Sequence, residues 1–192
     1  MIDHFQIFGL PRAFGVDSLA LERRFRELSR ELHPDKFATA PAPERRQALE
    51  RSTALNDAYR VLRDPQRRAG HYLELNGLAL EPGPEGRTAV TMSPEFLESF
   101  LDLRESFEGA SAEERGGLRD HLTAERTRRL ASLVADLGAV GEAPGREALV
   151  PLAQRLLELR YYDRFLNELD AELEGDLADP PAAANDRSGE PT

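Results

Sequence analysis

The chain has 192 residues, a formal net charge of −10 at pH 7, 31% charged residues and 40% hydrophobic residues. These values are ordinary for a globular protein of one or two domains. The absence of cysteine excludes disulfides and thiolate metal sites. The acidic total argues against general nucleic-acid binding, which needs a cationic surface. No stretch has the ~18 apolar residues that a membrane span requires, so we expect no membrane partner.

The distribution of charge and the start of the chain carry further information. Residues 1–75 contain 13 Lys+Arg against 11 Asp+Glu, whereas the remainder contains 12 against 24. This asymmetry predicts two modules that meet different partners. The first residues match neither a signal peptide nor an Arg-rich transit peptide, so we expect a bacterial-type cytoplasmic protein.

Two helices are predicted before residue 33. The first is short, from Asp3 to Phe8, and directs its aromatic side chains inward. The second runs from about residue 19 to residue 32 and is capped by Asp17 or Ser18. Its apolar positions follow helical spacing and are Leu21, Phe25, Leu28 and Leu32.

The opposite face of this second helix carries three arginines. Arg23, Arg26 and Arg30 keep the apolar spacing with an offset of two residues, roughly 200° around the helix. Glutamates at positions 22, 27 and 31 favour an ordinary solvated charged face. The neighbouring loop favours a docking surface for an acidic partner instead.

The segment at residues 33–37 reads His-Pro-Asp-Lys-Phe. Pro34 has no backbone N–H and pushes His33 out of the helical region, so the helix must end at about residue 32. Asp35 is expected to cap its own backbone in the following turn. The segment therefore predicts an exposed polar corner, anchored underneath by Phe37.

A third helix is predicted to begin near Pro43 and to end at Asp64-Pro65. Its apolar seam indicates an antiparallel pairing with the second helix and comprises Ala48, Ser52, Leu55, Tyr59 and Leu62. A shorter fourth helix follows at residues 67–75. The Gly70-His71 pair departs from a regular helical pattern, so we expect this helix to be less firm.

The second half of the chain predicts a three-helix bundle at residues 93–174, after a connecting loop at 78–92 that is rich in Pro and Gly. The bundle's first helix begins at Ser93-Pro94 and carries a core stripe of Phe96, Phe100, Leu103 and Phe107. A capping box at residues 111–114 opens the second helix, and leucines recur through the third. Residues 175–192 lack apolar periodicity and are predicted to be a disordered tail.

Catalytic and metal motifs are absent from the sequence. The four histidines stand at positions 4, 33, 71 and 121, and none forms a His-x-x-x-His pair. No glycine-rich phosphate loop and no serine elbow are present. An exposed turn such as residues 33–35 offers no desolvation for acid–base chemistry. We therefore expect no enzyme, no cofactor and no bound metal.

These features together resemble a known family. The Arg-rich helix, the His-Pro-Asp loop and the long helix after it resemble the J-domain of DnaJ-type co-chaperones. Its N-terminal position, the His-Pro-Asp-Lys-Phe form and the second acidic helical region resemble the HscB branch, over roughly residues 2–175. The resemblance implies an all-α protein with a J-domain at 1–77, which contains an antiparallel helical hairpin, followed by the C-terminal three-helix bundle.

The resemblance also implies two partners and no cofactor. The first is an HscA-like chaperone of the DnaK type, whose ATPase the J-domain stimulates. Its binding residues here would be His33, Pro34, Asp35 and Lys36, with Arg23, Arg26 and Arg30 as docking charges. The second is an IscU-like scaffold protein on which iron–sulfur clusters are built.

The scaffold-binding residues implied by the resemblance lie in the bundle and are Leu97, Leu101, Asp102, Arg104, Glu105 and Tyr161. Spacing alone favours a core position for the two leucines, whereas the resemblance predicts that they are exposed. Glu98 and Tyr161 depart from the family pattern, which has an apolar residue and phenylalanine there. The patch is therefore expected to be smaller and more polar.

Two other readings remain open from the sequence. One is a general J-protein that serves a housekeeping chaperone, although no Gly/Phe-rich or cysteine-rich region follows residue 77. The other is a helical scaffold in which the His-Pro-Asp triplet has no function.

Overall fold

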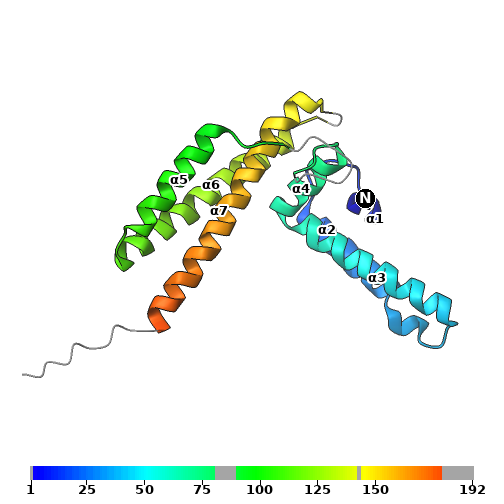
Figure 1. Cartoon of the computed structure of the whole chain (residues 1–192). Helices are drawn as coiled ribbons and strands as arrows, with labels where there is room; N and C mark the ends of the chain where they lie inside the picture. The colour runs from blue at the N-terminus through cyan, green and yellow to red at the C-terminus, as the bar shows by residue number, and fades with distance from the viewer. Residues whose placement is uncertain (1, 81–89, 142–143, 179–192) are drawn as a thin grey trace, which may run out of the picture.

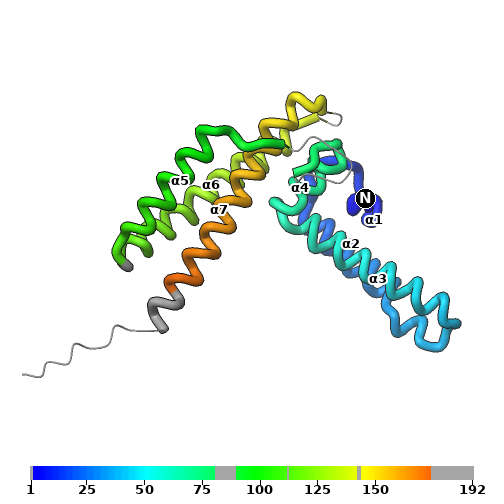
Figure 2. The backbone as a smooth tube through the Cα atoms, in the orientation of Figure 1, coloured from blue at the N-terminus to red at the C-terminus, as the bar shows by residue number. Residues whose placement is uncertain are grey.

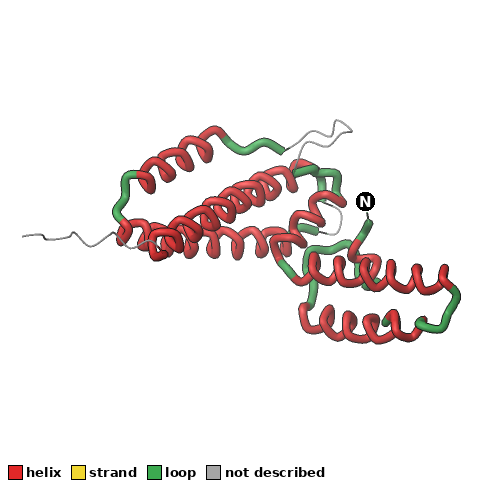
Figure 3. The backbone as a smooth tube through the Cα atoms, turned by 60° about the horizontal axis from the view of Figure 1, so that its bottom comes forward, coloured by secondary structure: helices red, strands yellow, loops and turns green. Residues whose placement is uncertain are grey.

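A computed structural model describes residues 2–80, 90–141 and 144–178. Within these ranges the chain forms seven α-helices and one 3₁₀ turn, and no strand is present (Figure 3). The predicted all-α class is confirmed. Residues 81–89 of the predicted connecting loop and residues 179–192 of the predicted tail lie outside the described part.

The N-terminal half forms an arm built on a helical hairpin (Figure 1). Its elements are α1 (His4–Ile7), α2 (Ser18–Glu31), the 3₁₀ turn η1 (Pro34–Phe37), α3 (Ala42–Arg63) and α4 (Pro65–Leu75). Asp17 caps α2 by accepting backbone hydrogen bonds from Leu19 and Ala20 at 2.8 and 3.1 Å. The rings of Phe25 and Tyr59 stack across the hairpin with centroids 4.0 Å apart. The loop at the tip is therefore held by two helices that pack along their apolar faces.

Helix α4 is continuous through the Gly70-His71 pair. Both residues are buried because they serve packing. A Cβ at Gly70 would lie 3.3 Å from Arg160 Nη2 of the last helix, so a larger residue here would require the Arg160 side chain to shift. His71 Nε2 accepts a hydrogen bond of 3.1 Å from the backbone N–H of His4, which fastens α1 to α4.

The C-terminal half forms the bundle of α5 (Pro94–Glu108), α6 (Ala112–Ala139) and α7 (Arg146–Ala178). Ser93 and Ser111 cap α5 and α6 as the sequence predicts, and Ser111 forms a complete capping box with Glu114. Helix α5 attaches to the bundle through aromatic side chains, because Phe100 and Phe107 both contact Phe165 of α7. Helix α7 extends to Ala178, past the predicted end of the bundle at residue 174.

The two halves share one hydrophobic core, although they form separate arms (Figure 2). Helix α4 packs against both α6 and α7. Buried residues of the first half contact buried residues of the bundle in a single cluster that includes Leu55, Leu62, Leu73, Leu133, Leu137, Leu156 and Leu159. Each fully buried leucine contributes roughly 1.5–3 kcal/mol. The shared core therefore fixes how the two arms are oriented.

A polar triangle covers the edge of this core. Gln66 of α4 donates to Asp163 of α7 at 2.5 Å. Arg126 of α6 donates to Asp163 at 2.7 Å and to Gln66 at 3.0 Å. Every side chain of the triangle thus has two partners on two other helices. The ring of bonds ties α4, α6 and α7 at one point.

None of the described helices is both long enough and apolar enough to cross a membrane.

Candidate functional site

The His-Pro-Asp corner lies at the free end of the hairpin. Helix α2 ends at Glu31, as Pro34 dictates, and His33 takes the backbone angles φ −59° and ψ 126°. The Nδ1 atom of His33 accepts a hydrogen bond of 3.3 Å from the backbone N–H of Asp35. The side chain that caps this turn is therefore that of His33, and the expected capping by Asp35 is wrong.

This cap has a consequence for the histidine ring. Because Nδ1 accepts, a neutral His33 ring carries its proton on Nε2. The Asp35 carboxylate also lies 3.4 Å from Nδ1. The His33 and Asp35 side chains are 56% and 89% exposed. The corner thus presents two groups to a partner: the Nε2–H of a neutral His33 ring and the exposed carboxylate of Asp35.

The three arginines of α2 are exposed, as predicted, but they differ in their partners. Arg26 forms an ion pair with Glu22 one turn earlier. Arg23 and Arg30 form no ion pair with any residue that the structure describes. These two side chains therefore keep their full charge available, while that of Arg26 is partly satisfied within the helix.

A second candidate surface is a depression of 340 Å³ between α5 and α7. Leu97 and Leu101 lie on it and are 40% and 61% exposed, so they do not belong to the bundle core. The ring of Phe100 forms its floor, 5.7 Å from Tyr161 and 5.4 Å from Phe165 between centroids. We call this depression the α5–α7 groove; its lining residues are Leu97, Phe100, Leu101, Arg104, Tyr161, Arg164, Phe165 and Glu168.

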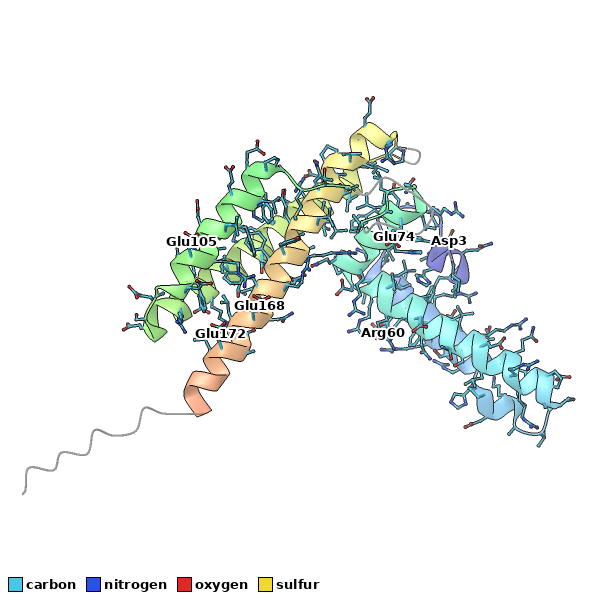
Figure 4. The ribbon with its side chains drawn as sticks, in the orientation of Figure 1. Asp3, Arg60, Glu74, Glu105, Glu168 and Glu172 are labelled. Atoms are coloured by element: carbon cyan, nitrogen blue, oxygen red, sulfur yellow. The ribbon has the colours of Figure 1, made fainter. Side chains whose placement is uncertain are left out.

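The groove brings together most of the predicted bundle residues, though not all of them. Asp102 and Glu105 do not line it and lie exposed on α5; Figure 4 shows Glu105 on α5 and Glu168 on α7. Arg104 is tied within the molecule, because it pairs with Glu168 at 3.0 Å and lies over the Phe165 ring at 5.3 Å.

On the α7 side of the groove, sequence reasoning identified Tyr161 and missed the other three lining residues. Arg164, Phe165 and Glu168 stand three, four and seven residues after Tyr161. This spacing places all three residues on the same helix face as Tyr161. Helical spacing from Tyr161 was therefore the sequence signal that could have identified them. Phe100 was predicted as core, and it is buried while its ring still lines the groove.

Comparison with known proteins gives a consistent result. The model of the DnaJ domain matches residues 3–71. The co-chaperone protein HscB homolog of Burkholderia multivorans is 34% identical over 171 residues, which cover 89% of this chain and 94% of that protein. The corresponding homolog of Bordetella avium is 35% identical, with coverage of 88% and 96%.

Solved structures agree with these relatives. The chaperone HscB from Vibrio cholerae superposes with a TM-score of 0.68 at 30% identity, over 92% of this chain and 99% of that chain. Human co-chaperone protein HscB superposes with a TM-score of 0.71 at 23% identity, over 90% and 82%. The second likeness supports the fold alone.

Proposed function

The chain belongs to the HscB family of J-domain co-chaperones, and from this membership we propose that it stimulates the ATPase of a specialised, HscA-like chaperone and delivers an IscU-like iron–sulfur scaffold protein to it. In this role the protein is an adaptor that hydrolyses no nucleotide itself. A DnaK-type chaperone is the partner that a J-domain implies.

The observation that carries this proposal is the presence of two separate exposed surfaces on one shared core. The His33–Asp35 corner lies at the tip of the hairpin, and the α5–α7 groove lies on the other arm. Two surfaces on one shared core suit a protein that holds a chaperone and its client at the same time.

Each surface suits its proposed partner chemically. Arg23 and Arg30 offer unpaired positive charge on the helix that leads to the corner, which favours association with an acidic surface. The exposed leucines of the groove offer apolar area, and such area near a groove centre supplies most of the binding energy in a protein interface. In this proposal His33, Pro34, Asp35 and Lys36 contact the chaperone, while Leu97, Leu101 and Tyr161 contact the scaffold.

The test is steady-state ATP hydrolysis by purified chaperones. An HscA-type chaperone and a housekeeping DnaK-type chaperone are each assayed with and without this protein, and with and without an IscU-type scaffold. We expect stimulation of the HscA-type enzyme that increases further when the scaffold is present. Equal stimulation of both chaperones with no scaffold effect would favour the general J-protein, and no stimulation of either would refute the proposal.

A further inference from the structure

Arg164 on α7 differs from the other charged residues of the α5–α7 groove. Its side chain is exposed, and its guanidinium carbon lies 4.5 Å from the centroid of the Tyr161 ring. It forms no ion pair with any residue in the described ranges. Arg104, on the facing helix, is paired with Glu168 at 3.0 Å. Arg164 is therefore the lining cation whose charge is not already neutralised.

The stacked position prepares Arg164 for one kind of ligand. A guanidinium that lies over an aromatic face keeps its N–H groups at its edge, where two of them match the two oxygens of a carboxylate. Stacking on Tyr161 also restricts the side chain before binding, which reduces the entropy lost when a partner is bound. A lysine offers neither the planar fork nor the same stacking.

Outside the groove, the exposed surface of α5 carries the opposite charge. Glu98, Asp102 and Glu105 are exposed along α5, and none of them forms an ion pair with a described residue. The groove therefore has an unpaired positive side chain on α7, while the exposed carboxylates of α5 stand outside its lining. A partner segment with the complementary charges fits in one direction, because the reversed direction places like charges together.

We propose that Arg164 determines specificity in the α5–α7 groove by forming a bidentate pair with a carboxylate of the bound scaffold, whose apolar side chains cover Leu97, Leu101 and Tyr161. This inference rests on the proposed function and adds the chemistry of the partner: an apolar segment with a carboxylate on its α7 side and basic residues on its α5 side. The arrangement fixes the direction in which the scaffold is bound.

The experiment is a titration of the full-length chain with an IscU-type scaffold in its metal-free form. Arg164→Gln should weaken binding roughly 5- to 20-fold and Arg164→Glu roughly 50-fold or more, in the range found for close interfacial charge pairs. Arg164→Lys should lie between wild type and Arg164→Gln, because it keeps the charge and loses the fork. Arg128→Glu, an equal charge change at an exposed α6 position outside the groove, should leave affinity within about twofold.

The carboxylate is then identified by charge exchange. Each exposed Asp or Glu of the scaffold is replaced by Lys and titrated against Arg164→Glu; one replacement should restore most of the lost affinity. If the wild-type chain binds and Arg164→Glu binds equally well, the inference is wrong and the proposed function stands. If the wild-type chain does not bind the scaffold, the proposed function fails and the inference fails with it. A large loss at Arg164→Glu that no scaffold replacement restores would also overturn the proposed pair.

Discussion

Gln66 and Asp163 are joined by a hydrogen bond of 2.5 Å although 97 residues separate them in the chain. The bond links the helix after the hairpin to the helix that lines the groove, and Arg126 closes the triangle from α6. Together with the shared core, it holds the His33–Asp35 corner and the α5–α7 groove in one geometry.

Replacing Asp163 by Ala should weaken this junction. The substitution removes the acceptor of both Gln66 and Arg126, and it leaves a partly buried guanidinium without its carboxylate. We expect the free energy of unfolding to fall by about 1–2 kcal/mol. Asp120→Ala is the matched control on α6, because its carboxylate is 78% exposed, and it should cost less than about 0.5 kcal/mol. Urea unfolding curves measure both; equal losses would show that the triangle adds nothing to the junction.

His33→Gln should abolish stimulation of the chaperone ATPase and leave the fold intact. The exposed ring contributes little to stability, while its Nδ1 cap on Asp35 gives the corner its shape. His121→Gln replaces an exposed histidine of α6 and should stimulate like wild type. ATP turnover and thermal melting are measured on the same preparations. If a folded His33→Gln protein stimulated the ATPase normally, the His33 side chain would have no role in stimulation.

Reversing Arg23 and Arg30 to Glu should slow chaperone docking by roughly tenfold, because unpaired surface charges act mainly on the association rate. The difference from wild type should shrink as salt is added. Arg46→Glu with Arg51→Glu makes the same charge change on exposed positions of α3 and should have a smaller effect. Stopped-flow association rates compare the two pairs. Identical association rates for both pairs would show that the α2 arginines are ordinary solvated charges with no role in docking.

The sequence allowed the helices and their caps to be predicted, since periodicity and capping are local signals. Asp17, Ser93 and Ser111 all cap where the pattern places them. Contacts between distant segments gave no such signal. The Gly70-His71 pair looked like a defect in α4 until the structure placed α7 and α1 against it. Arg164 was missed because only the folded structure shows that it lines the groove and has no carboxylate partner there.

The buried His71 predicts a loss of stability in mild acid. Desolvation by burial, and then the neighbouring His4, lower the pKa of His71 from 6.5 to about 4. Between these two values the unfolded chain binds a proton that the folded chain excludes, so stability falls as pH decreases from 6.5 toward 4 and is fully present above 6.5. The melting temperature of the wild type should decrease by several degrees over this window. His71→Gln should show a shallower slope than His121→Gln; parallel slopes would contradict a role for His71.

Leu97→Ala with Leu101→Ala should separate binding from folding. Both side chains are exposed, so their loss should lower the free energy of unfolding by less than about 1 kcal/mol. A bound scaffold would cover both leucines, and removing them should weaken binding by roughly 30-fold, given about 1 kcal/mol or more for each leucine at the centre of an interface.

Leu133→Ala is the contrasting variant: the Leu133 side chain is fully buried in the shared core, so its truncation should cost about 2–5 kcal/mol of stability. At a temperature where it stays folded, it should bind normally. Scaffold titration and chemical unfolding on all three proteins measure the two effects separately. Unchanged affinity in the double variant, together with a loss of stability like that of Leu133→Ala, would show that the leucines stabilise the bundle and that the groove is not the scaffold site.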